Sequence, residues 1–134
     1  MNVEYVIDAN IAIAVLNSDD LFHKQAMKFC LIENKVNILN VTKAEALIYP
    51  EKVGKIKQSE EIFKSLEIQT IPILDDIAMQ ACMLRAQYGN RKFPMIDALV
   101  VACGVVRNFN VVTTDTKWPT IKEADIHLLG DISK

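Results

Sequence analysis

Four acidic residues stand at positions in this sequence where a carboxylate could take part in chemistry. Asp8 and Asp115 directly follow short, largely apolar runs, YVI and VVTT, that are typical of buried strands. Asp97 is the only acid in the stretch IDALVVACGVVR, and Glu45 stands in TKAEAL. If these side chains meet, their oxygens form the kind of ligand set that selects hard cations such as Mg²⁺ or Mn²⁺.

Electrostatic repulsion makes such a meeting restrictive. Two carboxylates about 5 Å apart repel by roughly 3 kcal/mol at an effective dielectric constant of about 20. Four of them need a compensating cation to stay ionised together. The two histidines, His23 and His127, lie outside all four stretches, which disfavours a zinc hydrolase. The combination indicates metal-assisted phosphoryl chemistry.

Each acid also has a purely structural explanation. Asp8 and Asp115 could form turns that close strands. The segment from Thr42 to Glu45 fits a capping box, in which the glutamate reaches back to the cap amide. Asp97, in the first turn of a helix, gains about 0.3–1 kcal/mol from the helix dipole, but that does not explain a buried setting. The functional interpretation therefore depends on the convergence of all four.

The pattern of apolar residues predicts the elements that would position the acids. Strands are predicted at residues 3–7, 36–41, 68–74, 111–114 and 126–129. Helices are predicted at residues 11–16, 22–30, 42–49, 55–66, 75–88 and 96–107. This alternation indicates a parallel sheet between two helical layers. Ligands bind beyond the carboxyl ends of the strands in such sheets, and Asp8 and Asp115 fall there.

Several residues predict where these elements end. Ser18, Asp19 or Asp20 is expected to cap the second helix, and Asp75 or Asp76 the helix over 75–88. Pro50 is expected to interrupt the helix that begins at Thr42. A left-handed turn at Gly89 and Asn90 is expected to end the helix over 75–88. Pro72 predicts that the third strand lies at a sheet edge.

Composition limits the class of protein. A length of 134 residues predicts a single domain over 1–134, and 51% hydrophobic with 24% charged residues is typical of a globular protein. The net charge of −2 lacks the basic excess of a dedicated nucleic-acid binder, so any RNA contact needs a local patch or a bound cation.

The same composition predicts a cytoplasmic protein without membrane contact. No apolar run approaches the roughly 20 residues that span a bilayer, and the start, MNVEY, lacks the basic region of a secretory signal. The three cysteines, Cys30, Cys82 and Cys103, have no zinc-type spacing and are expected to be buried free thiols.

The sequence resembles the PIN-domain ribonucleases, and most of all the VapC-type toxins of toxin–antitoxin pairs. The matching stretches are YVIDANI, VTKAEAL, IDALVVACG and VTTDTKW, in the family's order. The resemblance implies a three-layer α/β/α sandwich with a mostly parallel sheet of four or five strands. It also implies an endoribonuclease that needs Mg²⁺ or Mn²⁺, leaves a 5′-phosphate and a 3′-hydroxyl, and has an antitoxin protein as partner.

The resemblance also assigns roles to residues. It implies a catalytic set of four acids, three of which hold the metal; the set is Asp8, Glu45, Asp97 and Asp115, and the ligands are Asp8, Asp97 and Asp115. Asn10 and Thr113, the latter in the family's T-x-D pattern, are expected to support these acids. Many relatives carry a second acid where this chain has Lys117, which leaves open whether one or two ions bind.

Basic and apolar side chains suggest contacts with partners. Four cations in or next to the motifs are candidate phosphate contacts, with ordinary surface charge as the alternative; they are Lys43, Arg91, Lys92 and Lys117. Two apolar helix faces could form a homodimer interface or an antitoxin groove, with ordinary core as the alternative; they carry Phe22, Ala26 and Phe29, and Ile56, Phe63 and Leu66.

Other functions fit the sequence less well. A haloacid-dehalogenase-like phosphatase needs a second aspartate two positions after the first, where this chain has Asn10. A receiver domain needs an acidic pair at the first strand, and Asp8 has no acidic neighbour. Two alternatives stay open: a non-catalytic PIN-like module that binds RNA or protein, and an RNA-processing nuclease outside toxin–antitoxin systems.

Overall fold

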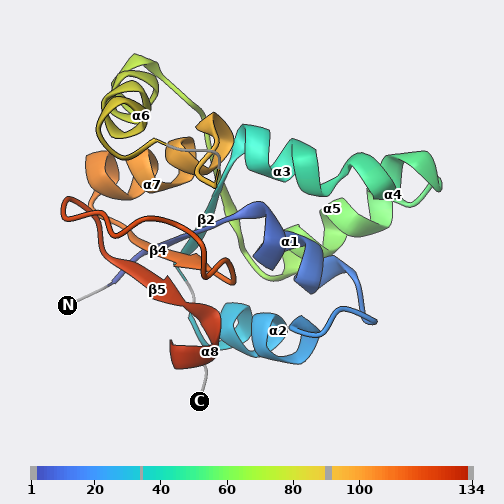
Figure 1. Ribbon diagram of the computed structural model, residues 1–134. Helices are drawn as coiled ribbons and strands as arrows, with labels where there is room; N and C mark the ends of the chain where they lie inside the picture. Colours follow the sequence, from blue (N-terminus) through green and yellow to red (C-terminus); the bar gives the residue numbers. More distant parts are fainter. Residues whose placement is uncertain (1–2, 34, 90–91, 133–134) are drawn as a thin grey trace.

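Five parallel strands form one sheet in the order β3-β2-β1-β4-β5 (Figure 1). The computed structural model describes residues 3–33, 35–89 and 92–132. Its strands are β1 (Tyr5–Ile7), β2 (Val36–Leu39), β3 (Gln69–Ile71), β4 (Asn110–Thr113) and β5 (Ile126–Leu128). The predicted α/β class is confirmed, and β3 lies at a sheet edge as Pro72 indicated.

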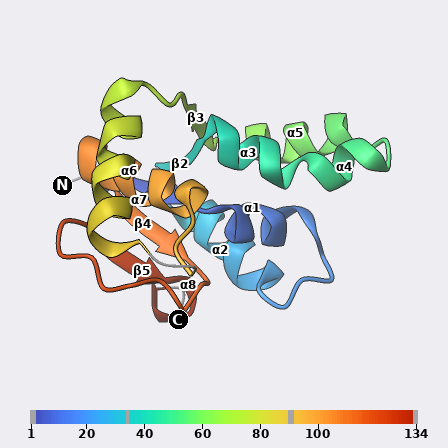
Figure 2. The ribbon, with the colours of Figure 1, turned by 45° about the horizontal axis from the view of Figure 1, so that its top comes forward.

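Helices cover both faces of this sheet. They are α1 (Ala9–Leu16), α2 (His23–Ile32), α3 (Asn40–Ala46), α4 (Ile48–Lys52), α5 (Ile56–Ser65), α6 (Asp75–Tyr88), α7 (Met95–Arg107) and α8 (Leu129–Ile132). Helices α6 and α7 lie on one face, and α1 and α2 on the other. Helices α3 and α4 extend away from the sheet, with α5 running back beside them (Figures 1 and 2).

The two core layers explain why the strands read as continuous apolar runs. Successive strand residues point to opposite faces of a sheet. In β1, Val6 packs among residues of α6 and α7, whereas Ile7 packs among residues of α1 and α2. Val111 and Val112 of β4 repeat this division. Every central position is therefore buried, as a parallel sheet covered on both sides requires.

The start of α3 differs from the predicted capping box. Helix α3 begins at Asn40, so Thr42 lies inside the helix and Leu39 is the cap residue. The hydroxyl of Thr42 is buried and has no hydrogen-bond partner within the described residues. The structure therefore removes the capping explanation for Glu45. Pro50 was also expected to interrupt the helix, but the break comes at Leu47.

Other helix ends also correct the predictions. Helix α2 begins at His23, later than the expected caps, and α6 begins with Asp75 in its first turn rather than at its cap. Gly89 has φ −64°, so it does not form the left-handed turn expected at the end of α6; Asn90 lies outside the described residues. The left-handed cap belongs instead to α7, at Asn108 with φ 58°.

The predicted partner faces are part of the core. Ala26, Phe29, Phe63 and Leu66 are buried together, with Phe22 and Ile56 packed against them. Of the two alternatives for these faces, ordinary core is therefore confirmed, and a partner interface on them is wrong.

The cysteines divide into two groups. Cys30 and Cys103 are buried free thiols as predicted, but Cys82 is exposed because α6 turns Ala81 and Leu84 to the core. Within the ranges that the structure describes, no helix is long and apolar enough to cross a membrane.

Candidate active site

Asp8 stands at the carboxyl end of the central strand and caps α1. Its Oδ1 accepts a hydrogen bond from the backbone N–H of Ile11 at 3.1 Å, and its Oδ2 accepts one from the hydroxyl of Thr113. The side chain is only 3% exposed. Burial raises the pKa of Asp8 to about 6, although the two hydrogen bonds act in the opposite direction.

Thr113 connects two of the acids. It ends β4, which pairs directly with β1, so its hydroxyl reaches Asp8 although the two residues are 105 positions apart in sequence. The same oxygen accepts the backbone N–H of Asp115 at 3.0 Å. The Oδ1 of Asp115 accepts the backbone N–H of Lys117 at 2.7 Å. Asp8 and Asp115 therefore form turns and also lie at one site, so the structural and the functional explanation are compatible for these two acids.

Asp97 lies in the first turn of α7 and is half-buried. Its Oδ2 accepts a hydrogen bond from the indole Nε1 of Trp118 at 3.1 Å. Burial raises the pKa of Asp97 and the Trp118 bond lowers it, while the negative charges of Asp115 and Glu45 raise it further. Glu45 itself is exposed on α3.

The four acids lie within one shared electrostatic field. The charges of Asp97 and Asp115 add to the raised pKa of Asp8, and those of Asp115 and Glu45 add to that of Asp97. Asp8 caps α1, Asp97 lies in the first turn of α7 and Glu45 lies in the last turn of α3; these three helices gather beyond the ends of β1, β2 and β4 (Figures 1 and 2). Repulsion of this kind is relieved by a cation.

The carboxylate oxygens of these acids are the type of ligand that a hard divalent ion prefers. Across residues 3–33, 35–89 and 92–132, no three acid, histidine or cysteine side chains are arranged as a complete metal site. Oxygens of Asp8, Asp97 and Asp115 instead accept hydrogen bonds from N–H groups of the protein. Each carboxylate oxygen has a second lone pair, so these hydrogen bonds leave it able to bind a cation.

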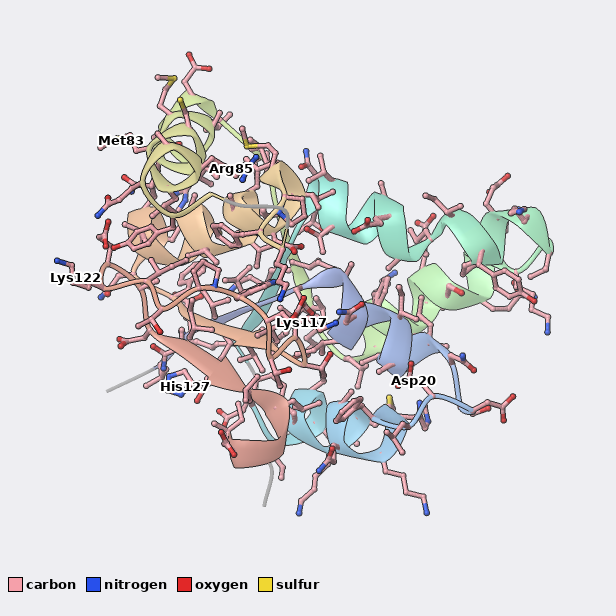
Figure 3. The ribbon with its side chains drawn as sticks, in the orientation of Figure 1. Asp20, Met83, Arg85, Lys117, Lys122 and His127 are labelled. Carbon is pink, nitrogen blue, oxygen red and sulfur yellow. The ribbon has the colours of Figure 1, made fainter. Side chains whose placement is uncertain are left out.

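The other predicted residues lie at different distances from this cluster. Asn10 is exposed on α1, and the hydrogen bonds to Asp8 come from Ile11 and Thr113. Lys43 donates to the hydroxyl of Thr70 at 3.5 Å, at the β3 edge of the sheet. Lys117 lies exposed on the loop after β4 (Figure 3).

Lys92, one of the remaining two cations of the predicted set, lies in the loop before α7. Lys92 is exposed there, and Arg91 lies outside the described residues.

Two side chains of the site were not identified from sequence. Trp118 bonds Asp97, and its ring packs against Phe93 with centroids 5.9 Å apart. Trp118 belongs to the stretch VTTDTKW, which also carries Asp115. A tryptophan three residues after that acid was the available signal, but its partner lies 21 residues away.

Comparison with protein families now identifies the fold. The family model described as the PIN domain matches residues 5–124. The chain belongs to the PIN-domain family. The match extends from β1 into the segment before β5 and so includes all four acids of this PIN domain. No curated protein sequence matches the chain significantly.

Solved structures share the same architecture. A toxin–antitoxin complex from Klebsiella pneumoniae contains a chain that is 22% identical, with a TM-score of 0.75 over 94% of this chain and 98% of that one. VapBC2 from Rickettsia felis, bound to a promoter DNA fragment, is 16% identical with a TM-score of 0.73 and the same coverage. VapC20 from Mycobacterium tuberculosis, a sarcin-ricin loop cleaving toxin, is 17% identical with a TM-score of 0.67 over 85% and 92%. At these identities the likeness shows the fold.

Proposed function

We propose that this PIN domain, acting as a single domain, is a metal-dependent endoribonuclease and the toxin of a toxin–antitoxin pair. The observation that carries the proposal is the buried carboxylate of Asp8 at the end of the central strand, in a field shared with Asp97 and Asp115. A buried acid beside other acids is unfavourable for a purely structural site. Membership of the PIN-domain family and the likeness to toxin structures support the same function.

Three of the acids would hold Mg²⁺ or Mn²⁺, namely Asp8, Asp97 and Asp115. Such an ion, when bound, lowers the pKa of a water molecule and offsets negative charge on the phosphate in the transition state. Thr113 fixes Asp8 and Asp115 relative to each other through its hydroxyl. Glu45 extends the negative cluster from α3 and completes the catalytic set.

The chain's histidines do not serve as a general base in this proposal. The Nδ1 of His23, the first residue of α2, lies 2.7 Å from the carbonyl oxygen of Ala14 on α1, and His127 lies on β5 (Figure 3). Lys43, Lys92 and Lys117 are proposed to contact the RNA backbone, because phosphate contacts position a substrate without reading its sequence. Arg91 is proposed for the same role.

A cleavage assay with Asp97→Asn tests the proposal. We expect the wild type to cut RNA with Mg²⁺ or Mn²⁺ and to stop in the presence of chelator. The variant is expected to lose more than about 100-fold in rate, since even outer-shell partners of a metal cost up to that amount. Asp125→Asn, which changes an exposed acid outside the cluster, is the matched control.

The assay also separates the alternatives. Cleavage that survives both chelation and Asp97→Asn would rule out the proposed site. Tight, metal-independent RNA binding without any cleavage would support a non-catalytic module instead. An RNA-processing nuclease would use the same acids, so growth arrest on expression is the result that distinguishes a toxin from it.

We propose that an antitoxin binds the groove between α1 and α4. Its apolar lining includes Ile13, Leu16, Ile48 and Tyr49, and the groove extends to Glu45. Tyr49 is 71% exposed. The neighbouring structures described as toxin–antitoxin complexes support a protein partner. A partner seated here would reach the acidic cluster.

A homodimer is also proposed. Analytical ultracentrifugation of the purified protein measures its oligomeric state.

Copurification with the product of the adjacent small reading frame tests the antitoxin proposal. We expect Tyr49→Asp to weaken binding by at least about 30-fold, as for an aromatic hot spot of roughly 2 kcal/mol, and to leave RNA cleavage unchanged. Leu21→Asp, at a residue 89% exposed and outside the groove, is the control. Equal binding by both variants, or growth arrest that the neighbour fails to relieve, would contradict the proposal.

A further inference from the structure

Trp118 connects the loop after β4 to the first turn of α7. It is the only tryptophan in the chain. Its indole Nε1 donates to the Oδ2 of Asp97 at 3.1 Å. Its ring also meets the ring of Phe93 edge-on, with an interplanar angle of 66°. One side chain thus contacts an acid of the cluster with its polar edge and the core with its apolar surface.

The platform beneath Trp118 is rigid. Phe93 is fully buried, and among the residues that the structure describes it has the largest fully buried side chain. Its carbonyl oxygen accepts a hydrogen bond from the Nη1 of Arg85 at 2.9 Å, which ties it to α6. Arg85 lies beside α7 in Figure 3. Trp118 therefore cannot turn away from Asp97 without losing its contact with a fixed ring.

The indole can only donate a hydrogen bond. It therefore restrains one oxygen of the Asp97 carboxylate and leaves lone pairs on both oxygens for a cation. The loop that carries Trp118 also carries Asp115, three positions earlier. This single contact consequently fixes Asp97 on α7 relative to Asp115, which Thr113 in turn fixes relative to Asp8.

We infer that Trp118 is a positioning residue for the divalent cation: its indole N–H orients the Asp97 carboxylate toward the ion that Asp8 and Asp115 share. The inference rests on the proposed function and names a residue outside the acidic set. Hydrogen bonds to a metal's ligands typically change its affinity by about 10- to 100-fold.

Calorimetric titration of the metal-free protein with Mn²⁺ tests the inference. Trp118→Phe keeps an aromatic ring against Phe93 and removes the donor, and we expect it to weaken Mn²⁺ binding by about 10-fold. Tyr88→Phe is the matched control, because it removes a 2.5 Å hydrogen bond to Glu123 on the same loop without touching the cluster. Tyr88→Phe should bind Mn²⁺ as the wild type does.

A measurement on the unaltered protein guards against a variant that fails to fold. The single indole N–H gives one signal in a ¹H–¹⁵N spectrum. We expect this signal to shift on titration with Mg²⁺, with the same midpoint as a calorimetric titration of the wild type with Mg²⁺. Wild-type affinity in Trp118→Phe, or an unmoved indole signal at saturating Mg²⁺, would overturn the inference and leave the proposed function intact. Absence of any Mg²⁺ or Mn²⁺ binding to the wild type would overturn both.

Discussion

Replacing Asp8 with asparagine is expected to stabilise the metal-free protein while it slows RNA cleavage on the order of 1,000-fold. Burial raises the pKa of Asp8 to about 6 from an ordinary value of 3.8. Between these two values the folded state binds more protons than the unfolded state, so the free energy of unfolding falls as the pH rises. The full loss, reached above the folded pKa, is on the order of 3 kcal/mol.

The asparagine side chain removes the charge and keeps an oxygen that can accept the N–H of Ile11. We therefore expect Asp8→Asn to unfold at higher urea concentration near pH 8 in the presence of chelator, with a gain of about 1–3 kcal/mol that disappears near pH 4. Added Mg²⁺ should stabilise the wild type and leave the variant unchanged. Cleavage should fall on the order of 1,000-fold, since an interaction with developing charge is lost.

Urea titrations across this pH range measure the expected difference. Asp125→Asn, an exposed acid away from the cluster, controls for the general effect of removing a negative charge. A variant that is less stable than the wild type near pH 8 would show that protein groups alone compensate the charge of Asp8, which would contradict a cation at this position.

Phe93→Ala is expected to be the most destabilising single change in the α6–α7 layer. The ring is fully buried among Ile77, Leu84 and Val101 of the same core cluster. Truncating a buried phenylalanine costs about 3–5 kcal/mol, from lost transfer free energy and from the cavity left behind. The support for the Trp118 ring disappears with it, so metal affinity should fall as well.

Chemical denaturation gives this cost directly. Phe93→Leu is the matched variant, because it retains most of the volume and should cost less than about 1.5 kcal/mol. A Phe93→Ala protein within about 1 kcal/mol of the wild type would mean that the cluster repacks around the gap.

The elements that carry the acids could be predicted because their signals are local. Apolar runs that end in an aspartate placed Asp8 and Asp115 at strand ends, and the parallel order of β1 and β4 then follows from the alternation of strands and helices. Their roles as ligands stay predictions. The contact of Thr113 with Asp8 crosses 105 positions, and no spacing in the sequence specifies which hydroxyl meets which acid.

Helix ends and partner surfaces were harder to predict for a different reason. Thr42 has the side chain of a good cap, but the helix starts earlier, at Asn40, where β2 ends. Phe29 marks the apolar face of α2, and Phe63 marks the apolar face of α5. Such a face shows that a helix is buried on one side, but it does not show whether the same chain or another chain covers it. Tertiary packing decides both.

The hydroxyl of Thr113 accepts a hydrogen bond from the backbone N–H of Asp115 and donates one to the carboxylate of Asp8. The acidic cluster therefore cannot form during synthesis before Thr113 has been added to the chain. The ribosome releases β1 before β4, so Asp8 leaves it well before Thr113, which lies 105 positions later in the chain. A cluster built in this order cannot hold a cation, and the proposed nuclease cannot cut RNA, until the segment that contains β4 has been translated.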